Sequence, residues 1–144
     1  MDKMNKAKEL LREFKGAAYI YGLNVLQQCG TLVADLGAGQ TAVLVTETFS
    51  GIDAHIEIVT NSLNSAGITV GATIPGAQPN APREDLQRIT ESIRNAKPDL
   101  VVSVGGGSTI DAAKTAIVLT SLGGDIEDYF GVWLVTARIE NMGR

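Results

Sequence analysis

Hydrophobic positions along the chain follow two alternating patterns. Apolar residues that recur every three or four positions predict amphipathic helices, and short continuous apolar runs predict strands covered on both faces. The helical spacing occurs in residues 4–14, 25–36, 52–66, 86–96, 110–117 and 133–142. Apolar runs predict strands at "AAYIYG" (17–22), "TAVLVT" (41–46), "ITVGAT" (68–73) and "DLVVSV" (99–104).

Glycine and proline separate these elements. "PGAQPNAP" (75–82) holds three of the four prolines and predicts a loop, and "DIEDYF" (125–130) predicts a short helical turn. Strand and helix patterns alternate from residue 17 to 122, and the long connections favour parallel pairing through right-handed crossovers. The expected fold is a doubly wound α/β sheet, mainly parallel, with helices on both faces. No linker divides the chain, so we expect residues 1–144 to form a single domain.

Composition narrows the class of protein. The chain has 144 residues, 44% of them hydrophobic and 19% charged, which is typical of a globular domain. A net charge of −4 without a Lys/Arg cluster argues against a nucleic-acid partner. One cysteine excludes an internal disulfide, no apolar run approaches the roughly 20 residues of a membrane span, and the charged N-terminus does not resemble a signal peptide. We therefore expect a cytoplasmic protein without a membrane partner.

Three consecutive glycines stand between a strand and a helix in "VVSVGGGSTIDAAK" (101–114). Ligands of parallel α/β sheets lie beyond the carboxyl ends of the strands, and backbone amides at a helix N-terminus bind phosphate. Side chains at these positions would keep a phosphate away from the amides, and Ser108 adds a hydroxyl donor. The alternative is a tight turn without a ligand, for which one glycine would be enough. The stretch matches neither G-x-G-x-x-G nor a Walker motif.

"GGGSTIDAAK" resembles the glycine motif of the iron-containing (group III) alcohol dehydrogenases, which share a Rossmann-like fold with glycerol dehydrogenase and dehydroquinate synthase. Further resemblances occur in order along the chain: "YGLNVLQQCG", "AVLVTET", "AGITV", "PNAP", "DLVVSVGGGSTIDAAK" and "DIEDYFG". They cover essentially the whole chain but only the N-terminal half of a family member. The resemblance implies hydride transfer between a small alcohol or aldehyde and a nicotinamide cofactor, and an N-terminal nucleotide-binding domain.

The resemblance also implies cofactor-binding residues. The pyrophosphate of NAD(P) would lie on Gly106, Gly107 and Ser108, and Gly105 of the same glycine run is a further cofactor-binding candidate. Glu47, at the end of a strand, would accept hydrogen bonds from the adenosine ribose and repel a 2′-phosphate, so we expect NAD, with NADP disfavoured. The alternative for Glu47 is a solvated loop residue.

Two further positions match the family pattern. Asn80 matches an asparagine that approaches the cofactor, although it could be an ordinary turn residue. Ala81 departs from the pattern, because family members usually have Pro-Asn-Pro here. Asp111 would contact the glycine loop or a ribose, or would simply pair with Lys114 one helical turn away. Trp133 stands where the family more often has a small residue.

Family members bind iron or zinc through one aspartate and three histidines of a C-terminal helical domain. This chain has one histidine, His55, without D-x-x-x-H spacing, and we assign it no role. Cys29 lies on a helix stripe and is expected to pack in the core. We therefore expect that the C-terminal metal-binding domain is absent, that this chain holds no metal, and that a chain truncated in this way is not competent alone. An uncovered apolar face would favour a homo-oligomer.

Two other interpretations stay open at this point. The chain could be a stand-alone, non-catalytic nucleotide-binding module that acts through a partner chain. It could also belong to the glycerol dehydrogenase or dehydroquinate synthase branch, although Ser108 after the glycines favours the alcohol dehydrogenase branch.

Overall fold

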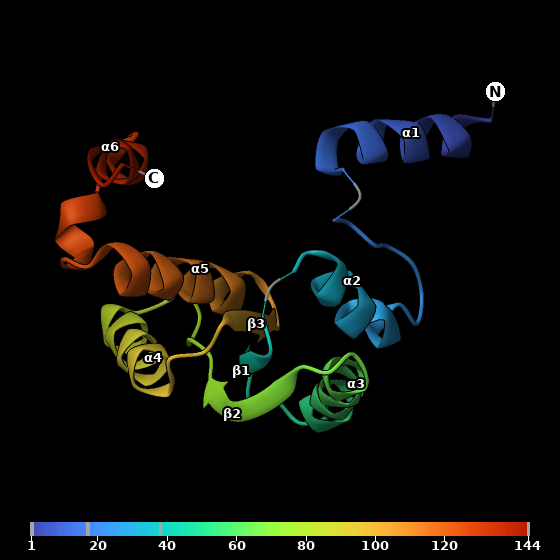
Figure 1. The fold of residues 1–144 in the computed structure, drawn as a ribbon, viewed down its shortest axis with the longest axis horizontal. Helices are drawn as coiled ribbons and strands as arrows, with labels where there is room; N and C mark the ends of the chain where they lie inside the picture. The colour runs from blue at the N-terminus through green and yellow to red at the C-terminus, as the bar shows by residue number, and fades with distance from the viewer. Residues whose placement is uncertain (1, 17, 38, 144) are drawn as a thin grey trace.

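The computed structural model of the chain describes residues 2–16, 18–37 and 39–143. Helices and strands alternate as the hydrophobic pattern predicts (Figure 1). In chain order the elements are α1 (Lys3–Lys15), η1 (Leu26–Gln28), α2 (Cys29–Asp35), β1 (Thr41–Thr46), α3 (Ile52–Ser65), β2 (Thr69–Pro75), α4 (Arg83–Ala96), β3 (Leu100–Val104), α5 (Gly107–Leu122), η2 (Ile126–Tyr129) and α6 (Leu134–Asn141).

The three strands form one parallel sheet in the order β2-β1-β3. Strand β1 is the central strand, and its residues 42–46 are all buried, as its continuous apolar run predicts. Helices cover both faces of the sheet, with α2 and α3 on one face and α4 and α5 on the other (Figure 1). The predicted fold class, a doubly wound parallel sheet, is therefore confirmed.

Alternate side chains of β1 supply the two halves of the core. Ala42 and Leu44 pack against Val59 and Leu63 of α3. Val43 and Val45 face α4 and α5. Their packing partners there include Leu86, Ile89, Ile93, Ala112, Ala113 and Ala116. Cys29 is half-buried against the α3 side, as expected for a packing residue, and burial raises the pKa of its thiol.

The strand predicted over residues 17–22 is wrong for the part of it that the structure describes. Residues 18–22 are irregular, and position 17 lies outside the described residues. The described sheet has only β1, β2 and β3, so this segment has no ladder partner. An isolated extended segment leaves its backbone groups to water, and apolar residues alone do not make it a strand.

Two other segments differ from the predicted pattern. The helix predicted over 25–36 divides into η1 and α2. Trp133, directly before α6, has φ +70°, a left-handed backbone that favours glycine and explains why a small residue suits this position.

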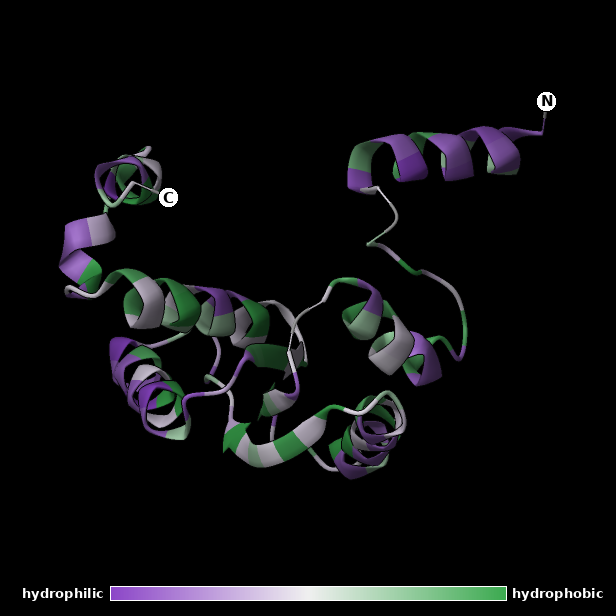
Figure 2. Ribbon diagram, in the orientation of Figure 1, coloured by the Kyte–Doolittle hydropathy of each residue, from purple (hydrophilic) through white to green (hydrophobic). Residues whose placement is uncertain are grey.

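The terminal helices lie at the periphery. Helix α1 has no buried residue, is largely polar, and stands apart from the sheet (Figures 1 and 2). Helix α6 also has no buried residue. The segments that position the candidate site therefore lie between β1 and α5.

Candidate functional site

The carboxyl ends of the three parallel strands lie along one edge of the sheet. Strand β1 leads into Glu47, β2 into Gly76 and β3 into Gly105. The helix that follows β1 and the helix that follows β3 cover opposite faces of the sheet, so the two connections diverge and leave a crevice between these neighbouring strands. The amide of Glu47 donates to the carbonyl of Val104 over 3.1 Å and continues the β1–β3 ladder to this edge.

The glycine loop, residues 105–107, joins β3 to α5 without any left-handed φ. A Cβ atom at Gly105 would lie 2.8 Å from Cγ of Glu47, and one at Gly106 would lie 3.0 Å from its Oε1. A Cβ atom at Gly107 would meet nothing within 4 Å. Because an unusual φ is not required at any of the three positions, a tight turn does not explain the three glycines.

Glu47 closes one side of this loop. Its Oε1 accepts a hydrogen bond of 2.8 Å from the amide of Gly106, the residue that caps α5. The carboxylate therefore lies at the positive end of the α5 dipole, where an anionic group is favoured. This placement also leaves the second carboxylate oxygen free of any hydrogen bond within the described structure.

A cleft of about 710 Å³ opens beside the loop, and we call it the carboxyl-end cleft. Its walls come from the segment after β1, the end of β2 with the loop that follows, α4, and the first turn of α5. The lining residues are Glu47, Thr48, Phe49, Pro75, Gly76, Ala77, Gln78, Pro79, Asp85, Arg88, Ser92 and Ser108.

The 76–82 loop forms one wall of this cleft and contacts the start of α5. The amide of Asn80 donates to Oγ of Ser108 over 3.1 Å. Asn80 and Ala81 have φ of +68° and +48°. Proline cannot adopt a positive φ, so replacing the usual Pro-Asn-Pro by Pro-Asn-Ala is accompanied by a loop conformation that proline at 81 would not allow.

The opposite end of the same loop is bound to α4. Arg88 donates to the carbonyls of Pro75 and Gly76, each over 2.7 Å, and to Oδ1 of Asp85 over 2.9 Å. Oδ2 of Asp85 accepts from the amide of Gln78 over 2.8 Å. The Gln78 amide, with Arg88 as the second contributor, lowers the pKa of Asp85 below its ordinary value.

The structure brings together most of the residues that the sequence singles out. Glu47, Asn80 and the stretch 105–108 lie at one edge of the sheet. Asp111 does not join them: its side chain is 73% exposed, and it pairs with Lys114 at 3.6 Å.

Sequence reasoning missed most residues of the cleft wall, and we single out Phe49, Asp85 and Arg88 among them. An acid and an arginine three positions apart, directly after a proline-rich loop, were the available signal for the last two. Phe49 carried no signal beyond its position two residues after Glu47.

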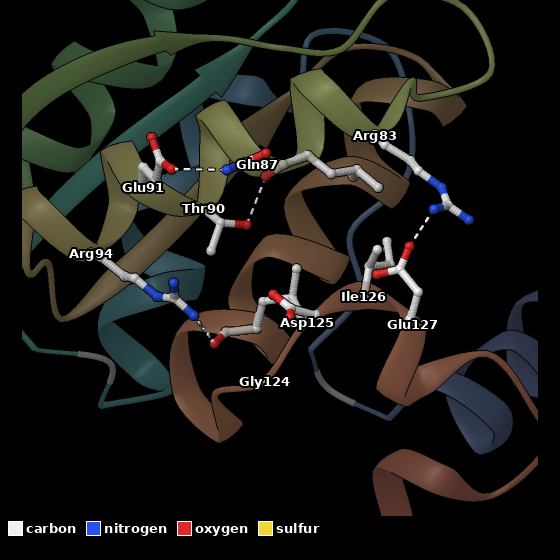
Figure 3. A pocket seen from close by; sticks show the side chains of 11 residues that line it. Arg83, Gln87, Thr90, Glu91, Arg94, Gly124, Asp125, Ile126 and Glu127 are labelled. Atoms are coloured by element: carbon white, nitrogen blue, oxygen red, sulfur yellow. Dashed lines mark hydrogen bonds and ion pairs between the residues drawn. The ribbon is translucent and has the colours of Figure 1, made fainter.

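A second cleft, of about 250 Å³, lies between α4 and the segment that follows α5 (Figure 3). It shares no lining residue with the carboxyl-end cleft. Its polar side chains already have partners: Arg83 pairs with Glu127, Gln87 donates to Glu91, and Arg94 donates to the carbonyl of Leu119 over 2.7 Å. We therefore assign it no ligand.

Other candidate groups contribute no site. Nδ1 of His55 lies 3.3 Å from the carbonyl oxygen of Gly51 on the surface of α3. Within the described ranges, no three His, Cys, Asp or Glu side chains gather as metal ligands would. Among the described helices, none has the length and apolar character needed to cross a membrane.

Comparisons of the chain with protein families, with curated proteins and with solved structures agree with one another. Residues 16–141 match the family described as iron-containing alcohol dehydrogenase. The NAD-dependent methanol dehydrogenase of Bacillus methanolicus is 32% identical over 115 residues, which are 80% of this chain and 30% of that protein.

Solved structures agree with this match. A 1,3-propanediol oxidoreductase superposes with a TM-score of 0.69 at 31% identity over 76% of this chain and 28% of its own. The NADH-dependent butanol dehydrogenase A of Thermotoga maritima gives a TM-score of 0.67 at 26% identity, over 77% and 28%. The chain thus spans about 30% of the length of curated relatives that it matches.

Proposed function

Because the chain belongs to the iron-containing alcohol dehydrogenase family, we propose that it binds a nicotinamide dinucleotide at the carboxyl-end cleft. In this proposal, residues 1–144 form the N-terminal, cofactor-binding domain of an alcohol dehydrogenase. The cofactor would place its pyrophosphate at Gly107 and Ser108, since the Gly106 amide is already bound by Glu47, with Asn80 beside it.

One observation carries the proposal. Gly107 has an ordinary backbone conformation, and the space around a Cβ atom there is empty. The free protein thus gains nothing from glycine at this position, since alanine fits the same backbone and leaves the unfolded chain less conformational freedom. A phosphate that approaches the first amides of α5 would need that space, because a methyl group would hold it away.

Glu47 supports NAD as the form that binds. Oε1 is held by the amide of Gly106, while the other oxygen is available to a ribose hydroxyl. A 2′-phosphate near the same carboxylate would be repelled: two like charges about 4 Å apart cost about 4 kcal/mol near a protein surface. The printed names of two relatives, NAD-dependent and NADH-dependent, favour the same choice.

The chemistry of the whole enzyme would be hydride transfer between a small alcohol or aldehyde and the nicotinamide ring, which the cofactor supplies when bound. The relatives act on methanol, 1,3-propanediol and butanol by name. The described residues of this chain gather no set of three side chains that could hold a metal for this reaction.

Self-association is a further part of the proposal. Phe130, Val132 and Trp133 are 61%, 78% and 77% exposed and lie within four consecutive positions. Exposed apolar groups of this kind favour contact with another surface. Sedimentation that finds a monomer at all concentrations would remove this part of the proposal and leave the cofactor site unaffected.

Titration of the 144-residue chain with NADH and NADPH tests the function. NADH should bind saturably and NADPH at least about tenfold more weakly, as expected when a 2′-phosphate faces a carboxylate. Glu47→Gln keeps an acceptor for the Gly106 amide but removes the charge, so the difference between the cofactors should shrink. His55→Ala, on the surface of α3, is the control. Failure of the wild-type chain to bind either cofactor would refute the proposal.

A further inference from the structure

Two charged side chains of α4 hold the 76–82 loop in place. The guanidinium of Arg88 spans two successive carbonyls, with Nη1 on Pro75 and Nη2 on Gly76. Asp85 accepts a hydrogen bond from the amide of Gln78 in the loop. Arg88 and Asp85 are also bound to each other, so one ion pair fixes the last carbonyl of β2 and two backbone groups of the loop.

This ion pair differs from the other salt bridges of the described residues in its shielding. The side chains of Asp85 and Arg88 are 18% and 40% exposed, whereas both partners of the Asp111–Lys114 pair are 73% exposed. Shielded, charge-assisted hydrogen bonds are stronger than exposed ones. The planar fork of arginine suits two adjacent carbonyls, which a lysine ammonium cannot span in the same way.

The 76–82 loop forms one wall of the carboxyl-end cleft, so the position of the loop determines the width of the cleft. Beyond Gln78 the loop continues to Asn80, whose amide reaches Oγ of Ser108 beside the glycine loop. The loop is therefore fixed to α4 at one end and to α5 at the other. If the α4 end were released, the loop would keep the 3.1 Å hydrogen bond to Ser108, the hydrogen bond from the Gly76 amide to the Thr46 carbonyl, and the packing of Ala77 and Ala81 against the core.

We propose that Arg88 and Asp85 are positioning residues, which hold the 76–82 loop at the separation from the glycine loop that a dinucleotide requires. The inference rests on the proposed function for the ligand, but the positioning itself is a property of the free chain. Arg88 and Asp85 act through the loop backbone and need not contact the cofactor.

Arg88→Ala tests the inference, with Arg94→Ala as a matched control. Arg94 lies on the same helix and also donates to a backbone carbonyl, that of Leu119, but it lines the second cleft (Figure 3). NADH affinity should fall about tenfold or more for Arg88→Ala, as expected from the loss of charged hydrogen bonds, and change less than twofold for Arg94→Ala. Arg88→Lys should recover part of the loss.

Amide hydrogen exchange measures the positioning without any ligand. In Arg88→Ala, exchange at the amides of Gln78 and Asn80 should accelerate about tenfold, with the amides of β1 unchanged. In Arg94→Ala both sets should keep their wild-type rates. Equal loss of affinity in the two alanine variants, or unchanged exchange in the loop, would overturn the inference.

The two proposals fail in different ways. If the wild-type chain does not bind NADH, the proposed function fails, while accelerated exchange confined to the loop of Arg88→Ala would still support the positioning. If NADH binds to the wild type and to Arg88→Ala with equal affinity, the cofactor site stands and the inference about Arg88 falls.

Discussion

Gly107→Ala should raise the stability of the chain and weaken its binding of NADH at the same time. Gly107 is the first residue of α5, its φ is not left-handed, and an added Cβ would meet no atom within 4 Å. Replacing glycine by alanine where the backbone accepts it without strain stabilises a protein by about 0.4–1 kcal/mol, because alanine leaves the unfolded chain fewer conformations. For a chain of this size, that increase corresponds to a Tm rise of about 1–3 °C.

The effect on binding has the opposite sign because the methyl group would occupy the space next to the first amides of α5. Loss of one hydrogen bond to a charged phosphate costs about 1.5–3 kcal/mol, which is about a 10- to 150-fold loss of affinity. Stability is read from thermal unfolding, and affinity from the fluorescence of bound NADH.

Gly71→Ala is the matched control for this experiment. Gly71 lies in β2, its Cβ would meet only the Ala42 carbonyl oxygen at an ordinary 3.8 Å, and it is far from the glycine loop in sequence. It should leave NADH affinity unchanged. An unchanged affinity for Gly107→Ala, with the stability increase observed, would refute the reasoning, because it would mean that the space beside Gly107 is not used by the cofactor.

Three further predictions concern stability. Gly30→Ala should lower the free energy of unfolding by about 3 kcal/mol in denaturant titrations, because its Cβ would lie 2.0 Å from the Ser62 carbonyl oxygen. Trp133→Gly should raise the free energy of unfolding by about 1 kcal/mol by relieving a left-handed backbone at a side chain that packs little; an unchanged or lower value would contradict this. Asp99 accepts hydrogen bonds from the Gln40 amide and from Thr41, which hold its pKa below the ordinary 3.8. Its stabilising effect is therefore complete above that value and is lost as the pH falls through the lowered pKa, so Asp99→Asn should lower stability at pH 7 and flatten the acid limb of a stability–pH profile.

The parts of the fold that follow from local pattern were predictable. The run "TAVLVT" predicts a strand buried on both faces, as observed for β1. The loop that follows it could be assigned to the ligand-binding edge of the sheet, because parallel strands end at a common edge. The segment 18–22 has a similar pattern, but a strand also needs a neighbour to complete its hydrogen bonds, and apolar character does not report whether a neighbour exists.

The candidate site divides in the same way. The glycine loop could be recognised in the sequence, because three consecutive glycines leave the backbone open to close approach by another group. The contact of Glu47 with the Gly106 amide depends on the pairing of β1 with β3. The hydrogen bonds of Arg88 to backbone carbonyls depend on the path of a proline-rich loop. Both contacts depend on the tertiary structure, and in the sequence Glu47 and Arg88 look like ordinary surface charges.

The pairing of β1 with both β2 and β3 also bears on how the chain folds. Glu47 and Gly106, which meet at the site, are 59 positions apart, whereas β2 reaches β1 through the single helix α3. Since contacts distant in sequence form slowly, we expect the β1–α3–β2 unit to close first and β3 to add later. Refolding followed by stopped flow should then show nucleotide binding only in the last phase, so that affinity for the nucleotide reports completion of the fold.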